Sequence, residues 1–417
     1  FNMGWINELK VRGSWGQLGN ADIPGGAYPQ YVGVNLWVEY MIGNQIQVGP
    51  TPASRLSNPE LTWETNTTMD FGFETSLFNN SIDFAATYYT RDTENFLVNI
   101  PVPVASGFTS APFNVGLVRN SGLELEAGYN TRIRDAVDLT ISGNLTTVNN
   151  ELVALTEGIE QFQQAGFYRT SVGQPIGYFY GFQTCGVFQT EAEAAASPRR
   201  PGNQPGAGDL CFRDLNADTV LNDQDRMYLG KTIPDAFYGI NLNAGFRGFD
   251  LTAFFTGVTG VQRFNALRAG FGLSGNPGLE TMGGGGANQL TTVRNRWTPT
   301  NPSNTTPRAI AGDPAGNNRL SDRWVEDGDF LRLKTLQLGY TLPDNLFGTR
   351  TRGTRLYVSA TNLWTLTDYS GLDPEFSSTP PGSAFGNANN QSQLQAGTDF
   401  GNIPQPRMFQ IGVTTTF

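Results

Sequence analysis

The sequence of 417 residues contains no histidine, and charged residues make up only 15% of it. The absence of histidine excludes a Ser-His-Asp or Cys-His catalytic arrangement and any imidazole-ligated metal site. No apolar run approaches the roughly 18–20 residues that a membrane-spanning helix needs. Lysine and arginine total 27 against 37 aspartates and glutamates, without a basic cluster, which argues against nucleic acid as a partner.

Cysteine is scarce as well. Cys185 and Cys211 lie on one polar, Gly-rich stretch. They form either a disulfide in an oxidising compartment or a pair of inert buried thiols. We favour the disulfide, which would constrain the unfolded chain by about 3–4 kcal/mol. The chain opens at Phe1 without a leader, so we interpret it as the C-terminal piece of a longer protein.

Alternating apolar and polar residues are the strongest pattern in the sequence. Residues 69–77 and 82–88 alternate on either side of Asn79-Asn80, which is typical of a β-hairpin. The same pattern predicts further strands, for a total of ten, at 123–129, 137–145, 238–246, 249–255, about 330–342 and 355–367, near 9–17 and at 407–417. Each is near the ~10 residues that a tilted strand needs to cross a membrane. A stretch at 176–188 also resembles a strand, which we place outside the membrane.

The connections between these strands are short on one side and long and polar on the other, which is typical of an outer-membrane β-barrel. A soluble β-sandwich or a propeller would explain the alternation but not this asymmetry. We therefore predict an all-β fold, a transmembrane antiparallel β-barrel segment with long extracellular loops. Ten strands in an open sheet would leave unpaired edges, so the segment should belong to a larger closed barrel. The longest of the predicted loops is the region 150–235.

That loop region carries an acidic motif of twelve residues. As a calcium loop it would supply oxygen ligands from Asp214, Asn216, Asp218, the Val220 carbonyl, Asn222 and Asp225. Two positions depart from the pattern: Thr219 replaces the expected glycine, and Asp225 replaces a bidentate glutamate. The alternative is an Asp/Asn-rich turn capped by its own side chains. Calcium is the one cofactor that the sequence suggests, and we expect no enzymatic activity.

Several motifs resemble the SusC/RagA family of TonB-dependent outer-membrane transporters. Residues 58–97, NPELTWETNTTMDFGFETSLFNNSIDFAATYYTRDTENFL, carry this resemblance most clearly. Others follow in order: NVGLVRNSGLELE at 114–126, VGQPIGYFYGF at 172–182, FRDLNADTVLNDQDRMYLG at 212–230, DGDFLRLKTLQLGYTLP at 327–343 and RLYVSATNLWTLTDYSGLDPE at 355–375. The resemblance implies a 22-stranded barrel with an N-terminal plug, of which this chain would supply the last ten strands.

The resemblance also implies a function. The expected activity is active import of a bulky nutrient, an oligosaccharide or oligopeptide, across the outer membrane of a Gram-negative, Bacteroidetes-like bacterium. The expected partners are a SusD-like surface lipoprotein and, through the N-terminal part, the TonB–ExbB–ExbD machinery. Two alternatives stay open: a structural or secretion-associated barrel that serves as a scaffold for surface proteins, and a secreted carbohydrate-binding β protein. Long-loop aromatic residues would either bind substrate or pack the loops, and the sequence singles out none of them.

Overall fold

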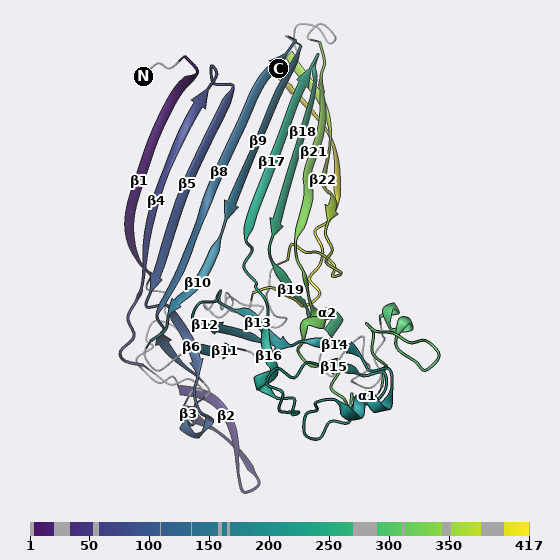
Figure 1. Ribbon diagram of the computed structural model, residues 1–417. Coiled ribbons are helices and arrows are strands. Elements are labelled where there is room, and N and C mark those ends of the chain that lie inside the picture. Colours follow the sequence, from purple (N-terminus) through teal and green to yellow (C-terminus); the bar gives the residue numbers. More distant parts are fainter. Residues whose placement is uncertain are drawn as a thin grey trace.

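The computed structural model describes residues 4–20, 34–52, 58–108, 110–134, 136–156, 161–164, 167–269, 290–310, 313–343, 352–376 and 396–416. Ten long strands form a curved antiparallel wall, in which each strand lies beside the next of the ten along the chain (Figure 1), and a short eleventh strand of the same sheet pairs with one of them. In order they are β1 (Ile6–Asn20), β4 (Glu64–Leu77), β5 (Ile82–Glu94), β8 (Leu117–Ile133), β9 (Val137–Thr147), β17 (Ala236–Phe246), β18 (Phe249–Thr259), β21 (Phe330–Thr341), β22 (Arg352–Leu366) and β24 (Met408–Thr416). The predicted fold class is confirmed, and each predicted spanning strand coincides with one of these.

Tight turns join β4 to β5 and β17 to β18 at the end of the wall where both chain termini lie (Figure 1). At Arg247-Gly248 the φ angles are 48° and 86°, as a two-residue type I′ hairpin turn requires. Phe78, Asn79 and Asn80 are also left-handed, at 53°, 55° and 63°. The turn residues and the alternation of the flanking strands therefore both indicate a hairpin within the same short stretch, which explains why these hairpins can be predicted from the sequence.

The period of two in the sequence becomes two chemically different faces of the wall. On one face, Met69 and Phe71 expose 56% and 64% of their surface, and at the other edge Ile411 exposes 86%. Their neighbours Asp70 and Gly72 lie on the opposite face, because successive side chains of a strand alternate. A continuous band of exposed apolar side chains on strands is what a lipid-facing barrel surface presents.

Most of the buried apolar residues lie in the long connections instead of the wall. One cluster includes Val98 and Val115, a second surrounds Phe179 and Trp324, and a third surrounds Phe212. In Figure 1 these connections gather at the end of the wall opposite to the chain termini. The long connections thus form a folded mouth with a core of its own, which the expectation of polar loops did not anticipate.

The folded mouth contains several small sheets. Four strands in the order β11–β12–β13–β16 form the largest, and β14 pairs with β15. Their bounds are β11 (Gln161–Gln164), β12 (Tyr168–Ser171), β13 (Tyr178–Phe182), β14 (Thr184–Val187), β15 (Leu210–Phe212) and β16 (Arg226–Gly230), with α1 (Glu191–Ala196) between β14 and β15. The remaining pairings involve β2 (Val34–Ile42) with β3 (Gln45–Pro52), β6 (Leu97–Pro101) with β7 (Ser110–Asn114), and β19 (Gln262–Asn265) with β20 (Val325–Asp327) and β23 (Thr398–Asp399). A short helix, α2 (Ala266–Ala269), follows β19.

The predicted loop region 150–235 lies largely off the wall. Its strands β11 to β16 belong to the small sheets, whereas β10 (Asn149–Ala154) pairs with β8 as part of the large sheet. The strand-like stretch 176–188 contributes β13 and β14, which belong to the small sheets and not to the wall, and its position outside the membrane stays a prediction. The extracellular position of this region stays a prediction. Within the described ranges, no helix is long and apolar enough to cross a membrane.

Candidate functional site

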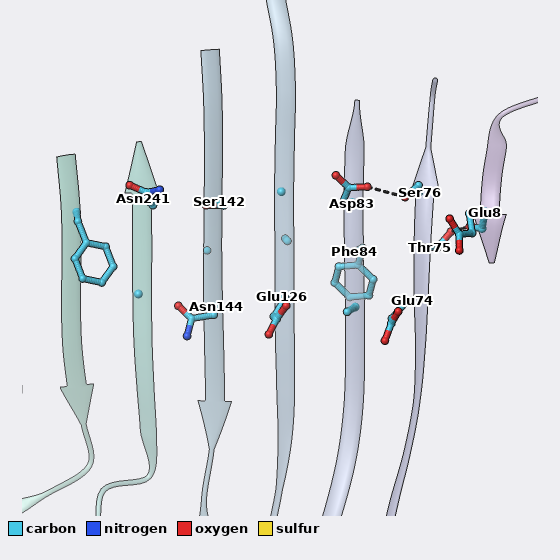
Figure 2. Close-up of a pocket in the computed structure, with 16 residues that line it drawn as sticks. Glu8, Glu74, Thr75, Ser76, Asp83, Phe84, Glu126, Ser142, Asn144 and Asn241 are labelled. Atoms are coloured by element: carbon cyan, nitrogen blue, oxygen red, sulfur yellow. Dashed lines mark hydrogen bonds between the residues drawn. The ribbon is translucent and has the colours of Figure 1, made fainter. Parts of the chain in front are cut away.

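The polar face of the wall lines an open cavity of about 520 Å³ (Figure 2). The carboxylates of Glu74 and Asp83 and the amides of Asn144 and Asn241 line it. The Ser76 hydroxyl donates a hydrogen bond of 2.6 Å to Asp83 Oδ1. The inner face is therefore covered by hydrogen-bonding groups, whereas the outer face is apolar. This is the arrangement of a barrel with a water-filled lumen.

A second cavity of about 550 Å³ lies on the same face, across β1, β4, β5 and β8. Arg12, Asp70, Arg91 and Glu124 contribute charges of both signs to its lining. The Arg12 guanidinium donates a hydrogen bond of 2.8 Å to the Thr87 hydroxyl. We call this the mixed-charge cavity. No local motif marks it in the sequence, because its residues come from four different strands.

A buried ion-pair network pins the segment after β22 against the wall. The Arg332 side chain, only 4% exposed, pairs with Asp373 and donates a hydrogen bond of 2.9 Å to Glu375. Lys334 adds hydrogen bonds of 2.8 and 2.7 Å to Glu375. Burial alone would raise the pKa of Asp373, but hydrogen bonds from Arg332 and from the backbone N–H groups of Gln405 and Glu375 outweigh it and hold that pKa below its ordinary value.

Sequence reasoning missed this network. The one feature of the sequence that points to it is a pair of basic residues, Arg332 and Lys334, at alternate positions of β21. The rest of that strand is largely apolar.

The structure brings Cys185 and Cys211 together in a disulfide between β14 and β15, with Cα atoms 5.0 Å apart. The bridge lies at the edge of the third cluster, beside Val187 and Phe212. It closes a chain segment with a sequence separation of 26 residues.

The disulfide should stabilise the folded mouth by about 3–4 kcal/mol through the entropy of the unfolded segment. We expect the Cys185→Ser/Cys211→Ser variant to be cleaved between residues 185 and 211 at protease concentrations that leave the wild type intact. Limited proteolysis of the full-length protein followed by mass spectrometry measures this. Equal cleavage of the two proteins would contradict the prediction.

Asp209, next to β15, anchors this region to a distant part of the chain. It is fully buried and accepts hydrogen bonds of 2.8 and 2.7 Å from the Arg308 guanidinium and one of 2.9 Å from the Asn317 amide. The hydrogen bonds to Asp209 raise the pKa of Arg308. A bidentate, charge-assisted contact of this kind fixes orientation as well as distance.

The predicted calcium loop is ordered by its own carboxylates. The two carboxylate oxygens of Asp214 accept hydrogen bonds from the backbone N–H groups of Ala217, at 2.7 Å, and Thr219, at 2.8 Å. Thr219, at the position of the expected glycine, has a φ of 65°. The Asn216 amide donates to Asp218 at 3.0 Å.

The end of the loop is capped in the same way. Asp225 is fully buried and accepts hydrogen bonds from the backbone N–H groups of Leu215, at 3.0 Å, and Asn222, at 2.8 Å. The Asn222 amide donates to the Val220 carbonyl at 3.3 Å. A cation bound through Asp214 and Asp225 would have to replace hydrogen bonds that both carboxylates already accept. Within the described residues, no three His, Cys, Asp or Glu side chains converge as metal ligands.

The calcium site stays a prediction, and it has a direct test. It predicts a saturable terbium luminescence signal from the full-length protein that Asp214→Asn abolishes. Asp223→Asn is the matched control, because Asp223 lies in the same loop but outside the predicted ligand set and pairs with Arg226 at 3.0 Å. A signal that is absent, or that both variants retain, would leave the self-capped turn as the correct description.

Several aromatic residues of the long loops pack the folded mouth. Phe167 and Tyr168 belong to the second cluster, and Phe113 packs against the first. Burial raises the pKa of Tyr168 to about 12, and its hydroxyl contacts Thr398. These three residues therefore have a structural role. Tyr28, Tyr31, Phe271 and Phe385, among the other loop aromatics, lie outside the described residues.

A wall with an apolar outer face, a polar inner face and a folded mouth defines a part of an outer-membrane β-barrel. The family model described as TonB dependent receptor-like, beta-barrel matches residues 1–363, and the chain belongs to this family. The family supports an outer-membrane location, and the predicted resemblance to SusC/RagA transporters is confirmed by the relatives.

Among the relatives, the TonB-dependent receptor P3 of Formosa agariphila is 31% identical over 422 residues, which cover 99% of this chain and 40% of that protein. The TonB-dependent receptor SusC of Bacteroides thetaiotaomicron is 25% identical over 431 residues, 99% of this chain and 38% of SusC. A solved structure of the RagAB peptide transporter superposes with a TM-score of 0.76 at 23% identity, over 99% of this chain and 41% of that chain, and shows the same fold. The chain thus spans about two-fifths of the length of its relatives.

Proposed function

We propose that the protein imports a bulky nutrient, an oligopeptide or an oligosaccharide, across the outer membrane in a TonB-dependent manner. The observation that carries the proposal is the wall itself, with exposed apolar side chains outside and polar cavities inside. A polar lumen offers hydrogen bonds to a hydrophilic solute that the lipid phase excludes. The family supports this function, because its members are TonB-dependent receptors.

The proposal includes two kinds of partner. A SusD-like surface lipoprotein would cover the folded mouth, and TonB–ExbB–ExbD would act on an N-terminal plug. The similarity to SusC, a TonB-dependent receptor, and to the RagAB peptide transporter supports these two kinds of partner. The source would be a Gram-negative bacterium similar to the Bacteroidetes of these relatives. We propose no enzymatic role.

Purification of the native complex in detergent, with mass spectrometry of every component, tests the proposal. We expect a full chain that includes a plug, together with a surface lipoprotein. A barrel that carries neither would favour the alternative of a scaffold for surface proteins. A chain that stays soluble without detergent would favour the secreted carbohydrate-binding protein.

A further inference from the structure

A cavity of about 370 Å³ opens on the outer face of the wall, where β17, β18, β21 and β22 reach the folded mouth. These four strands are neighbours in the large sheet (Figure 1). Tyr238, Leu331 and Leu366 form the apolar side of the cavity, and strand register places them in one cross-strand row with Gly257. Leu366 exposes 66% of its surface. We call this the rim cavity.

Gly257 gives the rim cavity its shape. A Cβ atom at this position would lie 2.2 Å from Tyr238 Cζ, so the glycine is what allows the ring of Tyr238 to lie across β18. The Tyr238 hydroxyl donates a hydrogen bond of 3.3 Å to the Phe330 carbonyl, which fixes the position of the ring. A tyrosine with its ring on an apolar surface and its hydroxyl on a polar group is typical of a membrane interface.

Carboxylates line the side of the rim cavity that faces the mouth. Among the described residues that line it, none is basic and three are aspartates: Asp327, Asp329 and Asp368. Asp329 accepts hydrogen bonds from the Thr259 hydroxyl at 2.5 Å and from the Val261 backbone N–H at 3.1 Å. Asp327 accepts one of 2.9 Å from the backbone N–H of Asp329. These donors are neutral, so they fix the positions of the two carboxylates without neutralising their charge.

The apolar side of the rim cavity continues along the outer face. The next cross-strand row toward the chain termini consists of Ile240, Phe255, Leu333 and Trp364. The remaining strands of a closed barrel would be added at β1 and β24, the two edges of the wall, and would leave this outer face in contact with lipid. An acyl chain that lies along these rows would place its head group at the carboxylates.

We infer that the rim cavity binds a membrane lipid whose head group carries a primary ammonium. The three aspartates hold the ammonium, because its N–H groups form charge-assisted hydrogen bonds with carboxylates. The acyl chains cover Leu331, Leu366 and the row below them, which removes apolar surface from water at the boundary of the mouth. Charge complementarity selects this head group, since an anionic lipid without an amine would meet three negative charges. The inference concerns the outside of the wall and does not depend on which solute the protein imports.

Native mass spectrometry of the full-length protein in detergent, titrated with two lipids, tests the inference. The lipids are dioleoyl phosphatidylethanolamine and dioleoyl phosphatidylcholine, which have the same acyl chains and the same net charge. Only the ethanolamine head group has N–H donors. We expect the wild type to bind phosphatidylethanolamine about tenfold more tightly, the equivalent of one charge-assisted hydrogen bond.

Two variants assign the contacts. Asp327→Asn/Asp368→Asn should bind both lipids with the affinity that the wild type has for phosphatidylcholine, which would also show that the cavity is intact. Leu366→Gln should weaken the binding of both lipids by about tenfold and keep the preference between them. Glu60→Gln/Glu94→Gln is the matched control, because it removes two exposed carboxylates that lie outside the rim cavity. The control should keep the tenfold preference.

Three results would overturn the inference. The first is equal binding of the two lipids by the wild type. The second is a preference for phosphatidylethanolamine that Asp327→Asn/Asp368→Asn retains or that the control loses as well. The third is displacement of the lipid by an equal concentration of glycerophosphoethanolamine, which has the same head group without acyl chains. That displacement would identify a soluble amine as the ligand of the cavity.

Discussion

Replacing Gly116 with alanine should destabilise the junction between β7 and β8 by roughly 2–5 kcal/mol, the combined cost of left-handed strain and overpacking. Gly116 has a φ of 87°, and a Cβ there would lie 2.0 Å from the Ala154 carbonyl oxygen and 2.7 Å from Leu155 Cα. Both atoms belong to backbone, so no side-chain rotation can relieve the clash. The adjacent Val115 is fully buried in the first cluster, and the damage should spread into it.

Gly107 provides a matched control for this prediction. Its φ of 80° is almost the same, but no atom lies within 4 Å of the position that a Cβ would occupy. Gly107→Ala should therefore show only the conformational cost of about 1–2 kcal/mol. Hydrogen exchange of the segment 94–118 in the full-length protein measures both effects. Equal loss of protection in the two variants would show that the clash is relieved by backbone movement.

Replacing Arg332 with methionine should release the segment after β22 from the wall, at a cost of about 3–5 kcal/mol. The change keeps the apolar stem but removes the cationic partner of Asp373, whose side chain is only 5% exposed. The backbone N–H groups of Gln405 and Glu375 still donate to Asp373, but they carry no net charge, so the buried carboxylate is left without a counter-charge. Hydrogen exchange and limited proteolysis of residues 367–376 report the release.

Arg355→Gln is the control for the ion pair. Arg355 and Asp250 are 26% and 36% exposed, so the loss of that pair should cost about 1 kcal/mol or less. The double variant Arg332→Met/Asp373→Asn should recover part of the stability, because no buried charge is left unpaired at residue 373. If the double variant is as unstable as Arg332→Met, packing of the guanidinium rather than its charge holds the segment.

The same network predicts a pH dependence with a defined sign. The folded state lowers the pKa of Asp373, so its contribution to stability is fully present above the ordinary aspartate pKa of about 3.9. The contribution is lost as the pH falls through the lowered folded-state pKa. Proteolysis of residues 367–376 by an acid-active protease should therefore increase at low pH in the wild type. Arg332→Met should show less of this change.

The wall could be predicted from the sequence because its signals are local. Alternation with a period of two assigns each side chain to a face whatever the strand pairs with, and turns such as Arg247-Gly248 occupy conformations that two-residue hairpins require. Pairing within each hairpin followed as well, since a short turn forces the two strands that it joins to lie side by side. The sequence favoured a bridge between the two cysteines but left two buried thiols as the alternative, and only the structure places their Cα atoms 5.0 Å apart.

The tertiary structure decided the rest, because the remaining interactions join residues that are distant in the sequence. Arg308 is 99 residues from Asp209, and Arg332 is 41 residues from Asp373. The mixed-charge cavity depends on the register of four strands, and a shift of one residue in any of them would turn its charges to the other face. The core of the folded mouth forms where several irregular connections meet, and no periodicity marks the residues that meet there. Local geometry therefore determined the wall, and long-range packing determined the folded mouth and the arrangement of charges on the inner face of the wall.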